Sequence, residues 1–340
     1  MLWNIWLKLV ILRCTEVSNS KSRLGVLGLI AIAAVCSIFY SLMSGAVPIS
    51  FHDVTQTVLQ QGPPNQIIWN IRLPRTLVGA LVGVNLALSG AILQSIMKSP
   101  LADPHIIGVS SGAGLAGMLV LIIFPHWEYL LTPIAFLGAL ASTSVIYILA
   151  WKGGIRPVRI ILAGVAVSAF LGAGIAGLLV FFSDRVHGAL MWMVGGLSAR
   201  SWPHLFAMLP YSIGGGLLAL WSARKLNILE LGDDIATGLG LSVERTRLVM
   251  TAVAALLAAS AVSVAGLLGF VGLVVPHAAR LMIGSDYRYV IPASAFLGIA
   301  VVTCSDTFAR TLFAPIELPV GIIMAFAGAP FFLYLLRKEP

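Results

Sequence analysis

Long uncharged apolar runs dominate this sequence and restrict what it can fold into. Each run approaches or exceeds the roughly 20 residues that a helix needs to cross hydrocarbon. Lipid admits only helices and closed barrels, and these runs lack the alternation of barrel strands. The sequence therefore predicts an all-α integral membrane protein with a single transmembrane domain over residues 1–340. The runs are Leu24–Val47, Thr76–Met97, Ile106–Pro125, Tyr129–Trp151, Ile160–Ser183, Pro203–Ala223, Leu248–Ala279, Tyr289–Ser305 and Leu318–Leu336.

Composition supports the same fold class. Charged residues make up only 10% of the chain, and apolar residues make up 59%. A soluble domain carries about 25% charged residues. A surface that faces water on all sides is therefore excluded.

One apolar run is too long for a single span. Leu248–Ala279 contains Gly266, Gly269, Gly272 and Pro276, which favour a break. We expect two helices that meet near Gly266–Gly269. This break raises the number of spans to about ten and places both termini on the same side of the membrane.

The distribution of basic residues tests this topology. In a ten-span topology, five of the 21 lysines and arginines lie on the side of the membrane opposite the termini, and sixteen lie on the side of the termini. A nine-span topology separates them less well. Because lysine and arginine gather on the cytoplasmic side, both termini are predicted to be cytoplasmic. The net charge of +8 then needs no nucleic-acid partner. The five are Arg72, Arg75, Arg185, Arg200 and Arg310.

Two segments outside the spans are predicted to contact lipid or a partner protein. Residues 1–23 are predicted to form a cytoplasmic or interfacial N-terminal segment that contacts membrane lipid. Residues 224–247 lie between spans six and seven and read as two short helices, with Asp233 and Asp234 capping one start and Gly238 and Gly240 ending it. A plain hydrophilic connection is the alternative. A partner-binding face is favoured because apolar residues recur there at helical spacing: Leu229, Leu231, Ile235 and Leu239.

The sequence lacks motifs for ATP binding and for metal-dependent hydrolysis, and its one hydrolase-like string has another explanation. No G-x-x-x-x-G-K-[ST] or H-E-x-x-H string occurs. The G-x-S-x-G string at residues 108–112 opens a membrane helix, so we interpret it as packing; an intramembrane serine hydrolase acting through Ser110 is the alternative. Cys14, Cys36 and Cys304 form no pattern that indicates a disulfide framework or a metal site. No bound metal or cofactor is expected.

Charge inside the membrane separates two classes of transporter. Ion-coupled transporters place ionisable residues at mid-membrane, where the coupling ion binds. Here the span centres lack them, and Asp306 and Arg310 sit at the outer end of span nine. An ion-coupled secondary transporter is therefore retained only as the alternative function.

An ordered set of short motifs indicates a family. Together they closely resemble the binding-protein-dependent permeases that import iron-siderophores, haem and cobalamin, from about Arg72 to the C-terminus. Each motif alone is weak, but their order is specific. The motifs are Arg72–Thr76 (RLPRT), Ser99–Pro104 (SPLADP), Gly108–Gly112 (GVSSG), Gly269–His277 (GFVGLVVPH), Glu317–Gly321 (ELPVG) and Gly328–Pro330 (GAP).

The resemblance implies a fold and a set of partners. It implies the type II ABC importer permease architecture, with ten spans and a second permease copy, identical or related. It further implies two cytoplasmic ATPase subunits, which bind ATP and Mg, and an extracytoplasmic substrate-binding protein. The chain itself would then be no enzyme, and would move its cargo by alternating access in the bacterial cytoplasmic (inner) membrane. A ferric siderophore is the first expectation for the cargo, followed by haem and cobalamin.

The resemblance also assigns roles to residues. Arg72, Arg75 and Arg310 match arginines on the outer rim that pair with glutamates of the binding protein. Such isolated charges on a charge-poor face would steer an acidic partner. Arg185 and Arg200 have no such match.

Two further sites follow from the resemblance. The cytoplasmic gate is expected at Ser99, Pro100 and Leu101, where serine replaces the usual asparagine, and at Pro157 and Val158. ATPase coupling is expected in the segment 224–247. Its matching residues are Leu231, Gly232, Ala236, Leu239 and Gly240.

Overall fold

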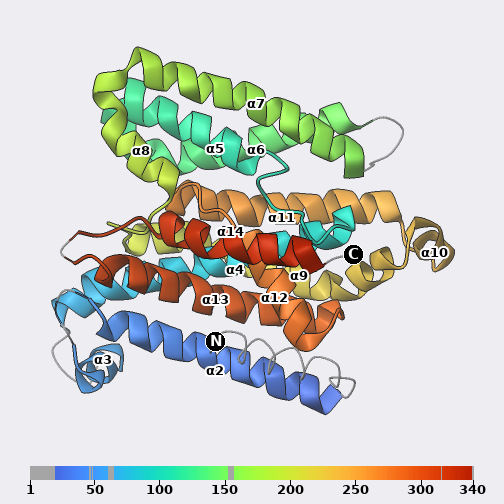
Figure 1. Cartoon of the computed structure of the whole chain (residues 1–340), viewed down its shortest axis with the longest axis horizontal. Helices are drawn as coiled ribbons and strands as arrows, with labels where there is room; N and C mark the ends of the chain where they lie inside the picture. The colour runs from blue at the N-terminus through green and yellow to red at the C-terminus, as the bar shows by residue number, and fades with distance from the viewer. Residues whose placement is uncertain are drawn as a thin grey trace.

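The computed structural model describes residues 20–45, 47, 49–59, 65–151, 157–314 and 316–338. Most of the predicted N-terminal segment, residues 1–19, lies outside this range. Every regular element within it is helical (Figure 1). The helices are α2 (Ser20–Met43), α3 (Phe51–Val58), η1 (Ile68–Arg72), α4 (Leu73–Met97), α5 (Val109–Met118), η2 (Leu119–Ile123), η3 (Pro125–Leu130), α6 (Leu131–Ala150), α7 (Pro157–Phe181), η4 (Ser183–Arg185), α8 (Val186–Val194), α9 (Trp202–Glu230), α10 (Asp233–Gly238), α11 (Val243–Ala265), α12 (Val271–Ile283), α13 (Tyr287–Thr311) and α14 (Val320–Lys338).

The described helices account for the ten predicted spans. Seven helical segments are long and apolar enough to cross a membrane. Each segment contains one of the helices α2, α4, α6, α7, α9, α11 and α13. Three shorter apolar helices complete the set: α5 with η2, then α12, then α14. In Figure 1 the connections alternate between the two ends of the bundle, and α10 lies beyond one end.

The break in the longest apolar run is confirmed. Helix α11 ends at Ala265 and α12 begins at Val271. Gly266 has φ 75°, and a Cβ there would lie 2.1 Å from the carbonyl oxygen of Trp192. Both the positive φ and this close approach require glycine, which is why the run turns at this residue.

Helix α4 is the centre of the bundle and contacts α9, α11, α12 and α13. Two glycine pairs allow the closest approaches. A Cβ on Gly83 would lie 2.2 Å from the carbonyl oxygen of Gly298 in α13, and a Cβ on Gly90 would lie 1.8 Å from that of Gly272 in α12. Without side chains between them, the backbones touch, as in small-residue packing of membrane helices.

Polar side chains reinforce this centre. The Asn85 amide nitrogen of α4 donates to the hydroxyls of Ser212 at 2.8 Å and Ser260 at 2.9 Å. The Ser89 hydroxyl donates to the carbonyl oxygen of Ala254 at 2.7 Å. These uncharged contacts join α4 to α9 and α11, a common use of polar residues between membrane helices.

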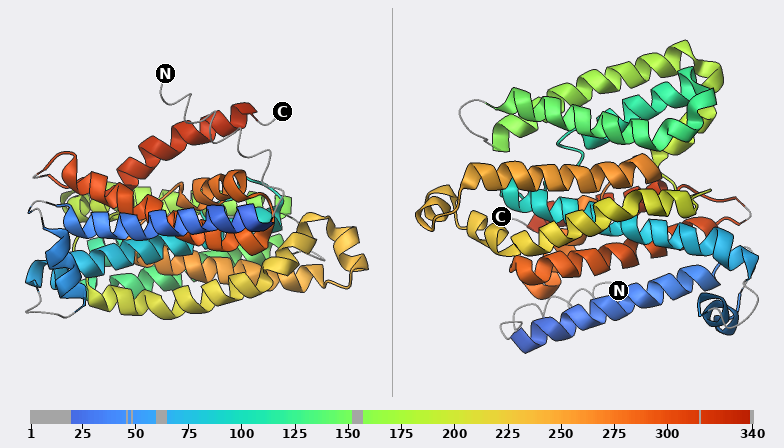
Figure 2. Two further views of the ribbon diagram at one scale, coloured as in Figure 1. Left: turned by 90° about the horizontal axis from the view of Figure 1, so that it is seen from below. Right: turned by 180° about the vertical axis from the view of Figure 1, so that it is seen from behind.

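Helices α5, α6, α7 and α8 form a second layer beside this core (Figures 1 and 2). Helix α5 packs closely on α6: a Cβ on Gly112 would lie 2.3 Å from the carbonyl oxygen of Gly138. The Ser142 hydroxyl donates to the carbonyl oxygen of Gly108 at 2.6 Å, at the start of α5. The short helix α8 follows α7 and leads into the connection to α9.

The segment 224–247 differs from its prediction. It contains one separate short helix, α10, because α9 continues to Glu230 and α11 already begins at Val243. Leu226 and Leu229 pack in the core, which holds the last turn of α9 in place. Leu229 therefore does not belong to an exposed face. Asp233 does not cap α10, whose N-cap is Gly232 without a side-chain bond.

Candidate functional site

A buried ion cluster lies at the start of α4. The Arg75 guanidinium donates to both carboxylate oxygens of Asp306, at 3.0 and 2.9 Å, and to Glu317 at 2.8 Å. Arg310 lies 3.2 Å from Asp306, one helical turn away on α13. Arg75, Asp306 and Arg310 are only 7%, 2% and 8% exposed. Two arginines thus meet two carboxylates in a pairing that leaves no net charge.

Glu317 is the one half-exposed member of the buried ion cluster, with 45% of its side chain accessible. It also accepts a hydrogen bond from Ser198, in the connection between α8 and α9, at 3.1 Å. Burial alone would raise the pKa of the Glu317 carboxyl, but the hydrogen bond from Arg75 holds this pKa below its usual value. Glu317 therefore ties the α13–α14 connection to both α4 and the α8–α9 connection.

Arg72 and Arg310 bind the end of α2. Arg72 donates to the carbonyl oxygens of Leu42 at 2.8 Å and Met43 at 3.1 Å, and also to that of Val47. Arg310 donates to the carbonyl oxygen of Ser41 at 3.1 Å. Cations suit the carbonyl end of a helix because the last carbonyls have no intrahelical partner.

The sequence-based picture of isolated charges is therefore wrong for Arg72, Arg75 and Arg310. Each of the three guanidinium groups is buried and has partners within the chain. Their proposed contact with a binding protein is a separate matter, and it stays a prediction. The missed partners were Asp306, whose i, i+4 spacing to Arg310 is a readable signal, and Glu317.

The first gate segment is an ordered turn after α4. Lys98 ends the helix in the left-handed conformation, with φ 50°, and the Ser99 amide donates to the carbonyl oxygen of Gln94 at 3.1 Å. The Ser99 hydroxyl then accepts the Leu101 amide at 3.3 Å. Pro100 and Leu101 are partly buried.

The second gate segment lies at the N-terminal start of helix α7. Pro157 is its first residue, and Val158 is exposed. The start of α7 and the connection between α4 and α5 lie at the end of the bundle that carries α10 (Figure 1). The structure thus places both segments at one end, and their gating role stays a prediction.

Helix α10 and its two ends carry three exposed apolar side chains, here called the apolar stripe of α10. Ile235 lies within the helix, whereas Leu231 precedes it and Leu239 follows it; they are 55%, 56% and 62% exposed, and Ala236 is fully buried. Gly232 and Gly240 have φ 114° and 82°, so both turns that flank α10 favour glycine. The predicted coupling residues therefore divide into two exposed leucines, one buried alanine and two turn glycines.

A second set of charges, the α10 ion cluster, fixes this helix to the bundle. The Asp233 carboxylate accepts bonds from Lys98 at 2.8 Å and from Arg247 at 2.9 and 2.8 Å. Burial alone would raise the pKa of Asp233, but these hydrogen bonds hold it below its usual value. Asp233 thus joins α10 both to the second turn of α11 and to the turn that contains Ser99.

The described residues contain no group of three His, Cys, Asp or Glu side chains that could hold a metal ion. The Ser110 hydroxyl is buried without a hydrogen-bond partner, so no general base within that range contacts it. A serine hydrolase needs such a base next to the nucleophile. The G-x-S-x-G string therefore serves the start of α5.

Comparison with known proteins agrees with this geometry. The sequence model described as the FecCD transport family matches residues 32–338. A permease named for cobalamin import in Halobacterium salinarum is 44% identical, with 83% of this chain and 77% of the relative covered. A permease named for Fe(3+)-citrate import in Bacillus subtilis is 38% identical, with 94% and 96% covered.

A solved structure shares the fold as well. It is described as an inward-facing conformation of a metal-chelate type ABC transporter, and it aligns with a TM-score of 0.82 at 27% identity. The alignment covers 93% of this chain and 99% of the solved chain.

Proposed function

The chain belongs to the FecCD transport family and is the permease of an ABC importer, and we propose that its cargo is a ferric siderophore, with haem or cobalamin as the next candidates. Relatives named for both citrate-bound iron and cobalamin are about equally similar, so similarity alone does not rank the cargoes. All are bulky chelates, and a permease of ten packed spans, with no metal-binding group among the residues that the structure describes, suits cargo that arrives already chelated.

The observation that supports ATP-driven transport is the apolar stripe of α10, which is exposed. An apolar stripe on a short helix fits a hydrophobic groove on a partner. Since the chain has no phosphate-binding loop of its own, that partner would be an ATPase subunit, with two per transporter. A second permease copy, identical or related, would complete the assembly in the bacterial inner membrane, with both termini cytoplasmic.

The α10 ion cluster gives a route from the ATPase to the gate. Movement of α10 would pull on Asp233 and, through Lys98, on the turn of Ser99, Pro100 and Leu101. Because α10 is also fixed to α11 through Arg247, it would move with the spans as a rigid body. Pro157 and Val158 would form the other side of the gate.

Docking of a binding protein is proposed at the opposite end. Acidic residues of that protein would approach Arg72, Arg75 and Arg310. Because Glu317 already occupies one nitrogen of Arg75, a docking carboxylate would have to displace it. Glu317→Gln should therefore raise the affinity for the binding protein, as measured by biolayer interferometry in nanodiscs. Unchanged or lower affinity would argue against pairing with Arg75.

Uptake into proteoliposomes tests the function as a whole. The permease is reconstituted with its ATPase and binding protein, and accumulation of a radioactive ferric siderophore, haem and cobalamin is followed. We expect uptake of the siderophore that requires ATP and persists after ionophores collapse the proton and sodium gradients. Uptake that collapses with a gradient while ATP remains would support the ion-coupled alternative. Saturable uptake of only haem or cobalamin would reassign the cargo.

A further inference from the structure

A groove of about 430 Å³ runs between α6 and α11, next to Arg247 of the α10 ion cluster. Leu140 and Ile148 of α6 line one wall, and Leu248, Ala252 and Leu256 of α11 line the other. Ile148 and Leu248 are also exposed on the surface of the bundle. The volume lies within the range of about 300–1,000 Å³ typical of ligand sites.

Two hydroxyls in this groove lack a hydrogen bond of normal geometry. Thr143 and Ser144 also line it, but both donate to backbone carbonyls of α6, at 2.9 and 2.8 Å. The buried Tyr147 and Thr251 hydroxyls lie near each other, but neither makes a hydrogen bond of normal geometry, and Thr251 is only 2% exposed. A buried hydroxyl without a partner is destabilising, so the groove favours an occupant with a polar atom at this level.

The level of these hydroxyls fits the membrane interface. The Tyr147 ring lies 6.4 Å from that of Trp151, which follows the last residue of α6. Tryptophan and tyrosine gather where hydrocarbon meets headgroups. The hydroxyls thus sit where a phospholipid carries its ester oxygens, with the apolar walls extending toward the hydrocarbon.

Two opposite charges lie on α11 beyond the end of the groove. Glu244 and Arg245 are both exposed and sit one turn before Leu248, on the helical stripes that contain Thr251 and Ala252. Arg245 precedes Thr251 by six positions, about 9 Å along the helix. Headgroup regions are about 5–8 Å thick on each side of the bilayer, so the backbone at both charges lies near the outer edge of this region and their long side chains can reach a headgroup.

We propose that this groove binds one molecule of phosphatidylethanolamine. An acyl chain lies along Leu140, Ala252 and Leu256, and the ester oxygens accept hydrogen bonds from Tyr147 and Thr251. Arg245 meets the phosphate. Glu244 accepts a hydrogen bond from the primary ammonium, which the quaternary ammonium of phosphatidylcholine cannot donate. This inference depends only on the membrane location and not on the proposed cargo.

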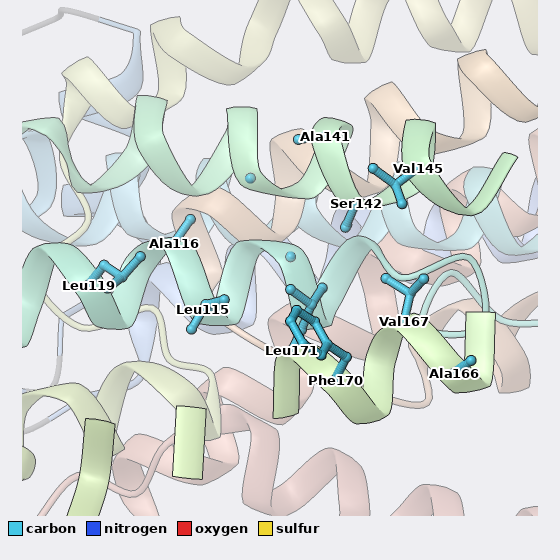
Figure 3. Close-up of a pocket in the computed structure, with 12 residues that line it drawn as sticks. Leu115, Ala116, Leu119, Ala141, Ser142, Val145, Ala166, Val167, Phe170 and Leu171 are labelled. Atoms are coloured by element: carbon cyan, nitrogen blue, oxygen red, sulfur yellow. The ribbon is translucent and has the colours of Figure 1, made fainter. Parts of the chain in front are cut away.

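A second groove supplies the matched control. It lies between α5, α6 and α7, with a volume of about 530 Å³ (Figure 3). Ser142 is the one hydroxyl among its lining residues, and it already donates to backbone carbonyls at 2.6 and 3.0 Å. Each groove has an exposed alanine, Ala252 in the first and Ala166 in the second. Phenylalanine at either position fills space without entering the core.

Native mass spectrometry of the full-length protein tests the proposal. Protein released from detergent is titrated with phosphatidylethanolamine, phosphatidylcholine or phosphatidylglycerol of the same chain length. We expect one retained lipid, with phosphatidylethanolamine bound about tenfold more tightly than the other two. Ala252→Phe should abolish this adduct, and Ala166→Phe should leave it intact. Tyr147→Phe with Thr251→Val should weaken it, as should Glu244→Gln.

The results that overturn the proposal are equally specific. Equal retention of the three lipids would remove headgroup recognition. An adduct that survives Ala252→Phe would place the lipid elsewhere, and one unaffected by Tyr147→Phe with Thr251→Val would remove the ester contact. A change in dimer fraction with Ala252→Phe, without any change in lipid, would assign the groove to a second copy of the chain.

Discussion

The two ion clusters lie at opposite ends of α4 and differ in burial. The buried ion cluster pairs Arg75 and Arg310 with Asp306 and Glu317, and three of these four side chains are nearly inaccessible. In the α10 ion cluster, half of the Asp233 side chain is accessible. The 23 residues from Arg75 to Lys98 span about 34 Å along a helix, close to the thickness of the hydrocarbon core.

The difference in burial implies a difference in role. Removing one partner of a buried ion pair costs about 3–5 kcal/mol, because the remaining charge has no water around it. An exposed pair contributes about 0.2–1 kcal/mol. The buried ion cluster therefore locks α4, α13 and the end of α2 together. In the α10 ion cluster the Lys98–Asp233 pair is exposed and can break and reform at low cost, while the buried Arg247 keeps Asp233 and α10 joined to α11.

The largest expected effect comes from Asp306→Asn. This change leaves Arg75 and Arg310 without their shared counter-charge, and we expect a loss of about 3–5 kcal/mol of stability. Thermal unfolding in nanodiscs, followed by tryptophan fluorescence, measures it. Glu317→Gln is the control, because solvent reaches this side chain, and it should cost clearly less. Equal losses for the two variants would contradict the assigned difference in burial.

The variant Asp233→Asn removes the carboxylate of the α10 ion cluster and tests whether this cluster serves transport more than stability. Solvent reaches half of this side chain, but the change also takes the counter-charge from the buried Arg247, so we expect a loss of stability of about 1–3 kcal/mol, less than for Asp306→Asn. Uptake should nevertheless fall severalfold, because α10 then loses its charged link to Lys98 and the gate turn. ATP hydrolysis and cargo uptake, measured in the same proteoliposomes, show whether the two become uncoupled. A variant that transports normally would show that this link does not carry the coupling.

The smallest effect concerns pH. The pKa values of Asp233 and Glu317 are both held below their usual values of about 3.9 and 4.3. A carboxyl group with a lowered folded-state pKa stabilises the fold above its unfolded pKa, and this stabilisation is lost as the pH falls through the folded value. The stability difference between wild type and Asp233→Asn, or Glu317→Gln, should be constant from pH 7 to about 5. It should shrink only below about pH 4.

Thermal unfolding between pH 7 and 3 checks this expectation. Because each variant lacks one carboxyl group, the difference from wild type isolates the contribution of that group. A difference that already shrinks between pH 7 and 5 would mean that the folded-state pKa is raised.

The sequence predicted the spans better than the contacts between them. The apolar runs and the glycines near Gly266 predicted the ten spans and the break before α12, because both are local properties of the chain. The apolar stripe of α10 was also readable from spacing. Leu229 was misplaced because its burial depends on how far α9 continues, which spacing alone does not show.

The partners of the arginines were harder to find. Asp306 lies four residues before Arg310 and could have been paired with it, but the Arg75–Glu317 contact joins residues 242 positions apart. Such a pair follows only from the packing of α4 against the α13–α14 connection. The same holds for Lys98 and Asp233, 135 positions apart.

Copurification of the ATPase tests the central claim most directly. Tagged protein is isolated from its native membrane in lipid nanodiscs, and bound subunits are identified by mass spectrometry. We expect an ATPase subunit with the wild type and at least about tenfold less with Leu231→Asp and Leu239→Asp combined, while thermal stability stays unchanged because both leucines are exposed. No ATPase with the wild type, or an intact complex with normal stimulated hydrolysis in the variant, would contradict the account.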